Sequence, residues 1–146
     1  MIVPGTFRAA VEANDLDALT RTLDPAIEFH SPVMVRSYRG RDAVSTLMRV
    51  LTDTFEDFHY THDLVGTELP RWPGPAGDDP SGGRSPDGAL AQALVFNARV
   101  MGKSVQGLDL LTFNREGLVA DLTVMVRPLP AAMTLARAVG RRMEEL

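Results

Sequence analysis

Residues 107–128, GLDLLTFNREGLVADLTVMVRP, contain two strand-like runs joined by a short polar turn. In the second run the apolar residues alternate with polar ones, which is the period of a β-strand with one buried face. The turn NREG supplies asparagine and glycine, residue types that tight turns favour. The pattern predicts two paired strands, over residues 103–114 and 118–128.

Working outward, two more runs upstream have strand character. Residues 89–102 lead through the turn MGKS into the first strand of the pair, so the three runs predict a meander. Residues 58–65 also have a period of two, which predicts Phe58, Tyr60, His62 and Leu64 on one side of a strand. By the same alternation, His59 and His62 would lie on opposite faces, which does not favour a metal site there.

Helical spacing of apolar residues occurs in four places. Residues 4–14 and 16–23 predict two short helices, and Asp24-Pro25 ends the second before a strand over residues 26–33. The clearest helix is predicted at residues 41–55, where five apolar residues recur at spacings of three and four. Residues 130–146 begin with a proline that suits a helix entry and predict a terminal amphipathic helix.

Composition limits the classes of function. A length of 146 residues suits one domain with its own core, and the chain has no cysteine and a net charge of -4. We therefore predict no metal, no cofactor, no disulfide and no nucleic-acid footprint. No apolar run is long enough to span a membrane, so we expect a cytoplasmic protein.

The segment 67–88 has too many turn-forming residues for a regular element. It holds five prolines and five glycines among 22 residues. We predict a flexible hairpin loop that contributes little to stability, since the cost of closing a loop grows slowly with its length. Trp72 within it either covers a cavity or lies on the surface.

Three segments carry a resemblance to a known family. The segment NDLDALTRTLDPAIEFHSPV (14–33) is similar to a family pattern of D-hydrophobic-D followed by a strand that ends in a polar residue and proline. YRGRDAV (38–44) resembles its helix entry, and residues 107–128 resemble its last two strands. The chain thus resembles the nuclear transport factor 2-like, or SnoaL-like, superfamily, which includes ketosteroid isomerases, polyketide cyclases and limonene epoxide hydrolases.

The resemblance implies an α+β fold: a cone-shaped, curved, mixed or antiparallel sheet wraps around N-terminal helices, with a C-terminal helix, and encloses a pocket. One SnoaL-like domain would cover residues 1–146. By motif, the isomerase base falls on Ser31, the oxyanion tyrosine on Phe7 and the oxyanion aspartate on Asp109, while the cyclase aspartate falls on Val124. Serine is no base without a partner and phenylalanine donates no hydrogen bond, so these known mechanisms are incomplete here.

Asp109 is the candidate catalytic residue. Its neighbours on the same side of the strand are apolar, so burial should raise the pKa of its carboxyl. Two interpretations stay open: a buried structural carboxyl bonded to a helix end or to Tyr60, and a neutral acid that donates a hydrogen bond to a ligand carbonyl. The predicted ligand-binding residues around it are Phe7, Ser31, Leu47, Leu51, Tyr60, Leu122, Val124 and Val126.

His30 is a second candidate. Adjacent strand residues point to opposite faces, so either His30 or Ser31 faces the cavity, and the resemblance places Ser31 inward. On the last strand, Asp121, Thr123 and Arg127 are expected on a solvated or subunit-facing surface.

The sequence predicts a binding protein for a small apolar, polyketide-like or steroid-like ligand. The alternatives are an isomerase, a cyclase or an epoxide hydrolase-like enzyme that uses Asp109, and a dimeric interaction module without a ligand. A filled interior would favour the last. We also expect a homodimer, because the outer face of the meander carries apolar residues, and the family commonly pairs through this sheet. These residues are Val95, Met101, Val119 and Met125.

Overall fold

The predicted strand pair forms the middle of a six-stranded sheet in the computed structural model, which describes residues 5–70 and 88–146. The strand order is β2-β1-β6-β5-β4-β3. Strand β1 runs parallel to β6, and the other neighbours are antiparallel, so the sheet is mixed as expected. The strands are β1 (Leu23–His30), β2 (Tyr38–Arg39), β3 (Glu56–Thr67), β4 (Leu90–Val100), β5 (Lys103–Phe113) and β6 (Val119–Arg127).

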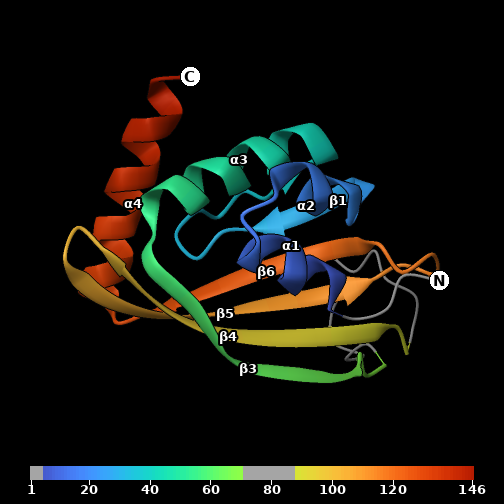
Figure 1. The fold of residues 1–146 in the computed structure, drawn as a ribbon. Coiled ribbons are helices and arrows are strands. Elements are labelled where there is room, and N and C mark those ends of the chain that lie inside the picture. The colour runs from blue at the N-terminus through green and yellow to red at the C-terminus, as the bar shows by residue number, and fades with distance from the viewer. Residues whose placement is uncertain (1–4, 71–87) are drawn as a thin grey trace.

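Three helices cover one face of this curved sheet, and a fourth stands at one end (Figure 1). They are α1 (Thr6–Glu12), α2 (Leu16–Arg21), α3 (Arg41–Thr54) and α4 (Leu129–Glu144). Helix α3 packs against β1 and α4, as its apolar stripe predicts. The α+β class and the curved sheet around N-terminal helices are therefore confirmed.

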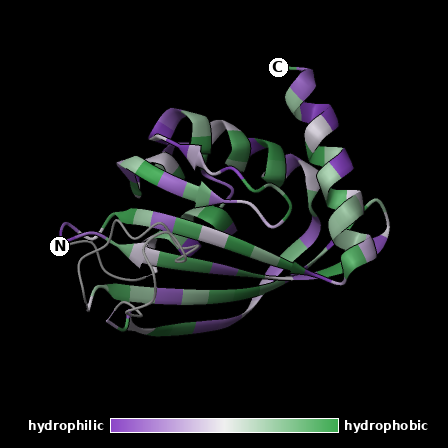
Figure 2. Ribbon diagram, turned by 180° about the vertical axis from the view of Figure 1, so that it is seen from behind, coloured by the Kyte–Doolittle hydropathy of each residue, from purple (hydrophilic) through white to green (hydrophobic). Residues whose placement is uncertain are grey.

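The core lies between the sheet and the helices. Along the strands, hydrophobic and hydrophilic residues alternate (Figure 2). In β5, the buried residues are every second one from Val105 to Phe113, which includes Asp109 as predicted. No helix in the described part of the chain is long and apolar enough to span a membrane.

The first strand begins earlier than predicted. Strand β1 starts at Leu23, which the sequence assigned to a helix, because Leu23 pairs with Val119 of β6. The register shifts between Leu23 and Glu28, and this irregularity accommodates Pro25, which has no amide hydrogen to donate. The short strand β2 was not predicted.

A β-bulge changes which residues of β3 share a face. Tyr60 pairs with Phe96, but His62 pairs with Val95, so one extra residue lies between them. The predicted grouping of Tyr60 with His62 and Leu64 is therefore wrong, and Asp63 is the residue that returns to the inner face. His59 pairs with Asn97, so His59 and His62 share the outer face rather than lying on opposite faces.

The predicted exposure of two residues of β6 is also wrong. Val119 is fully buried in the core, because a register shift at Thr112 and Phe113 turns this end of the strand. Asp121 is only 7% exposed rather than solvated. Most of the predicted 67–88 loop, residues 71–87 with Trp72, lies outside the described residues, while Thr67 belongs to β3.

A phenylalanine ring lies over a glycine at the centre of the inner face. Phe96 of β4 and Gly107 of β5 are cross-strand partners, and both are buried. A Cβ atom on residue 107 would overlap the Cζ, Cε1 and Cε2 atoms of the Phe96 ring. The missing side chain of Gly107 is thus what leaves room for the ring.

We predict that Gly107→Ala destabilises the fold by about 1–3 kcal/mol, since a methyl group there forces the Phe96 ring out of its position. Denaturant unfolding measures the change. Gly66→Ala is the matched control, because Gly66 also lies in a strand but a Cβ there meets no atom within 4 Å. The control should be neutral or stabilising by up to about 1 kcal/mol. Equal unfolding midpoints for the two variants would contradict the prediction.

Candidate functional site

A cavity of about 420 Å³ lies between the helices and the inner face of the sheet. Helices α1 and α3 form one side, and strands β3 to β6 form the other. Its lining is Val11, Glu12, Asn14, Met48, Leu51, Thr52, Phe55, Phe58, His59, Tyr60, Phe96, Asp109 and Val124. Most of these side chains are apolar.

Asp109 reaches this cavity from the middle of β5. Its cross-strand neighbours are Leu94 of β4 and Val124 of β6, both buried, so the carboxyl has apolar residues on either side. Tyr60 comes from β3, two strands away, and its hydroxyl donates a hydrogen bond to Asp109 Oδ2 at 3.2 Å. Flat strands two apart are separated by roughly 10 Å, so the curvature of the sheet and the length of the tyrosine ring together make this bond.

Burial controls the protonation of this pair. Desolvation raises the pKa of Asp109 from 3.8 to about 7, although the hydrogen bond from Tyr60 lowers it in part. Burial and the nearby Asp109 charge also raise the pKa of Tyr60 well above its ordinary value. Near neutral pH the Tyr60 hydroxyl is therefore protonated. The Asp109 carboxyl loses its proton and becomes charged as the pH rises through about 7.

Four aromatic rings form the wall beside Asp109. Phe58 stacks on Phe96 with ring centroids 4.8 Å apart, and Phe55 meets Phe96 edge-on at 5.4 Å. Tyr60 lies edge-on to Phe58 at 5.0 Å. Such pairs contribute about 0.5–1.5 kcal/mol each beyond their buried area, so this wall is rigid.

A second cavity of about 200 Å³ lies under α4. Leu51, Phe55 and Val124 line both cavities and stand between them. The other residues lining the second cavity are Phe29, Ser31, Pro32, Val33, Met34, Tyr38, Leu47, Leu135, Ala136, Val139, Gly140 and Met143.

The predicted ligand-binding residues fall into three groups. Leu51, Tyr60 and Val124 line the Asp109 cavity as predicted. Leu47 and Ser31 line the second cavity instead, and the Ser31 hydroxyl accepts hydrogen bonds from the backbone amides of Val33 and Met34.

The remaining three line neither of these two cavities. Phe7 and Leu122 are fully buried in the core, because both point straight into the space between helix and sheet. Val126 is partly buried at the margin of that core. These three differences have one cause. The spacing of apolar residues in the sequence indicates which face of a helix or strand points inward, but it does not indicate which part of that face borders a cavity.

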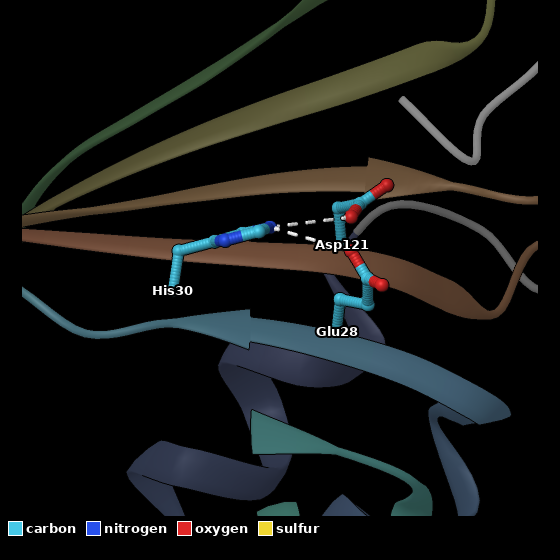
Figure 3. A group of neighbouring side chains, drawn as sticks. All are labelled: Glu28, His30 and Asp121. Atoms are coloured by element: carbon cyan, nitrogen blue, oxygen red, sulfur yellow. Dashed lines mark ion pairs between the residues drawn. The ribbon is translucent and has the colours of Figure 1, made fainter. Parts of the chain in front are cut away.

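His30 lies away from both cavities, in an ion-pair cluster with Glu28 and Asp121 (Figure 3). Its Nε2 atom is 3.5 Å from Asp121 Oδ1 and 3.9 Å from Glu28 Oε2. His30 follows inward-facing Phe29 in β1, so alternation directs it to the other face. His30 therefore lines neither the Asp109 cavity nor the second one, and its candidate catalytic role stays a prediction.

The same three residues have the donor types of a metal site, with ligand atoms within 4.8 Å of one another. However, Arg39 Nε already lies 3.0 Å from Glu28 Oε1. Arg39, and His30 when protonated, supply positive charge to the carboxylates without a metal ion. Glu28 and His30 are two residues apart in β1 and so share a face, but Asp121 comes from β6 and Arg39 from β2. No local pattern indicated that these strands would bring the four side chains together.

The sequence also did not predict most of the aromatic wall, or the polar residues Glu12 and Thr52 that line the Asp109 cavity. Phe55 was placed on a helical stripe and Phe58 on a strand face, but nothing local indicated that they meet Phe96. Glu12 and Thr52 line the cavity from the exposed ends of two helices. Their polarity is typical of any solvated helix end, so no sequence signal distinguished them.

The known proteins that this chain resembles agree with the family resemblance seen in its sequence. Residues 5–69 match the family model of the SnoaL-like domain. No curated protein matches the chain in sequence. Among solved structures, the chain is similar to a steroid delta-isomerase from Pseudomonas aeruginosa, with a TM-score of 0.75 and 28% identity over 95% of this chain and 87% of that one.

Two other structures share the fold. One is an uncharacterized bacterial protein with a cystatin-like fold from Silicibacter pomeroyi, with a TM-score of 0.76 and 22% identity over 96% of this chain and 84% of that one. The other is a putative polyketide cyclase from Sinorhizobium meliloti, with a TM-score of 0.54 and 17% identity over 82% and 90%.

The pKa of Asp109 predicts how stability depends on pH. Because the folded pKa is above the unfolded value of about 3.9, the contribution of the neutral acid is complete below that value and is lost as pH rises through about 7. Asp109→Asn removes this dependence while keeping a similar shape. We expect the variant to unfold within about 1 kcal/mol of the parent at pH 4 and to gain stability relative to it up to pH 8. If the free energies of unfolding of the parent and the variant differ by the same amount at every pH from 4 to 8, the prediction is wrong.

Proposed function

We propose that the chain is a member of the SnoaL-like, or nuclear transport factor 2-like, superfamily, and that it binds a small, mainly apolar ligand. In this proposal the protonated carboxyl of Asp109 donates a hydrogen bond to a carbonyl oxygen of the ligand. The observation that carries it is a buried carboxyl, with its pKa raised to about 7, on the wall of an apolar cavity.

The size and lining of the cavity support a ligand. A volume of about 420 Å³ is within the roughly 300–1,000 Å³ of small-molecule sites, which combine apolar walls with a few placed polar groups. An interaction module without a ligand would be favoured by an interior filled with side chains, and this interior is not filled.

The arrangement of Asp109 and Tyr60 supports a neutral donor. Tyr60 already donates to Oδ2, so a ligand carbonyl, which can only accept, needs the proton of the acid itself. In an apolar cavity this hydrogen bond has little competition from water, which makes it more favourable than on the surface.

Isomerase or cyclase chemistry is the alternative, favoured by the likeness to a steroid delta-isomerase. It needs a second group that removes a proton. Ser31, which takes the place of the base by motif, lines the other cavity and accepts hydrogen bonds from its own turn. The Asp109 cavity holds one further carboxylate, Glu12, at its exposed rim beside Arg8.

A pair of matched ligands tests the binding role: 2-acetonaphthone, which has a carbonyl, and 2-ethylnaphthalene, which has none. We expect the ketone to bind more tightly below pH 7 than above it, and Asp109→Leu to weaken it about tenfold while leaving the hydrocarbon unchanged. Calorimetric titration measures both. Ketone affinity that is independent of pH and of Asp109 would rule out the donor role.

The same ketone separates binding from catalysis. An isomerase-like site should exchange the methyl hydrogens beside the carbonyl with D₂O, and NMR follows this loss of signal. A binding protein leaves the exchange rate at that of the buffer. Glu12→Gln is the informative variant, since it removes the rim carboxylate and keeps its shape.

We also propose a homodimer formed through the outer face of the sheet, in a cytoplasmic protein. Met125 of β6 and Leu64 of β3 are 52% and 60% exposed there, whereas Met101, which is 68% exposed, lies in the turn between β4 and β5. Val95 is half-buried on the same face, whereas Val119 no longer supports this interface. Large exposed apolar groups in one region are typical of interaction surfaces.

Sedimentation tests the dimer, with Met125→Glu as the variant. We expect the parent to sediment at twice 15.9 kDa at micromolar concentration, and the variant to dissociate because a charge in the interface loses its hydration. A parent that sediments only as the 15.9 kDa monomer would contradict the dimer.

A further inference from the structure

We propose that the cavity under α4 is a second lobe of the ligand site and takes a hydrocarbon tail. The ligand class is then an elongated carbonyl compound, with its oxygen at Asp109 and its alkyl chain under the C-terminal helix. This inference rests on the proposed function, because it concerns the other end of the same ligand.

The two cavities are adjacent across a single layer of side chains. Leu51, Phe55 and Val124 contribute to the walls of both. Phe55 is held by a tilted contact with the Phe58 ring at 5.6 Å and an edge contact with the Phe96 ring at 5.4 Å. Val124 has a stiff branched side chain in a strand. Leu51 is half-buried on the last turns of α3 and is neither a ring in the aromatic wall nor a branched strand residue. The proposal therefore requires a change of the Leu51 rotamer to join the two spaces.

The chemistry of the second lobe suits hydrocarbon. Its polar side chains are those of Ser31 and Tyr38, and the Ser31 hydroxyl is already engaged by the backbone amides of Val33 and Met34 at 3.1 and 3.2 Å. The rest of the wall is apolar or glycine. An apolar wall of this kind favours contact with apolar groups over contact with water.

The size of the lobe indicates part of a ligand rather than a whole one. Its volume of about 200 Å³ is below the roughly 300 Å³ at which sites hold a complete small molecule. The Asp109 cavity, which has the polar groups, would hold the carbonyl end. Helix α4 stands beside α3 at one end of the sheet (Figure 1). Five of its residues line the lobe: Leu135, Ala136, Val139, Gly140 and Met143.

A series of straight-chain ketones from 2-hexanone to 2-dodecanone tests the second lobe. We expect the affinity of the parent to rise about fourfold for each added methylene until the lobe is full, the factor that corresponds to about 0.8 kcal/mol per buried CH₂. Calorimetric titration gives the affinity at each length.

Ala136→Leu fills the lobe from α4 without touching the Asp109 cavity. It should remove the gain for the longer ketones and leave 2-hexanone unchanged. Arg137→Leu adds the same side chain at the next position, which is exposed, and should behave as the parent. If Ala136→Leu does not fold, Gly140→Leu serves instead, because a Cβ there meets no atom within 4 Å and leucine favours a helix more than glycine.

The outcomes separate the two proposals. If the affinity for the ketones does not depend on chain length, or rises equally in the parent and the lobe-filling variants, the proposal that the second lobe binds the alkyl chain is wrong. If 2-hexanone binding is insensitive to Asp109→Leu, the donor role fails, whatever the chain-length dependence shows.

Discussion

The contact between the Phe96 ring and Gly107 is the constraint on which the inner face depends. Gly107 has no side chain, so the ring of its cross-strand partner lies over the backbone of β5. From that position Phe96 stacks on Phe58 and meets Phe55 edge-on. These contacts connect the end of α3 to β3 and β4. They also form the wall beside which Asp109 lies.

The Asp109 carboxyl is costly for the fold and useful for a site. Burial opposes its charge, and the one described hydrogen bond to its side chain, from Tyr60, compensates only in part. A leucine would pack there without that cost, so the acid conflicts with the apolar pattern of its own strand. Conflicts of this kind between local environment and residue type are concentrated at functional sites.

The fold alone does not decide the chemistry, because related frames carry unrelated reactions. What distinguishes this chain is the combination of a buried carboxyl, a serine at the position where the resemblance implies a base, and two cavities that share a wall. The polar groups belong to one cavity, and the other is almost purely apolar. This division is the reason for which we propose an elongated ligand with one polar end.

The amino-acid sequence by itself determined most of the elements and the inner faces of several of them. The helix at residues 41–55, the strand pair at 103–114 and 118–128, and the burial of Asp109 follow from periodicity within a few neighbouring residues. The raised pKa of its carboxyl followed from the same apolar neighbours. Local patterns contain this information because each element must bury one face.

Only the tertiary structure decided which inward residues border a cavity and which side chains meet. The bulge in β3 reversed the faces predicted for His62 and Asp63, and a register shift buried Val119. Tyr60 reached Asp109 across an intervening strand, while His30 joined Asp121 on the other face. Strand order, register and curvature are set by contacts between residues distant in sequence, so no local period contains them.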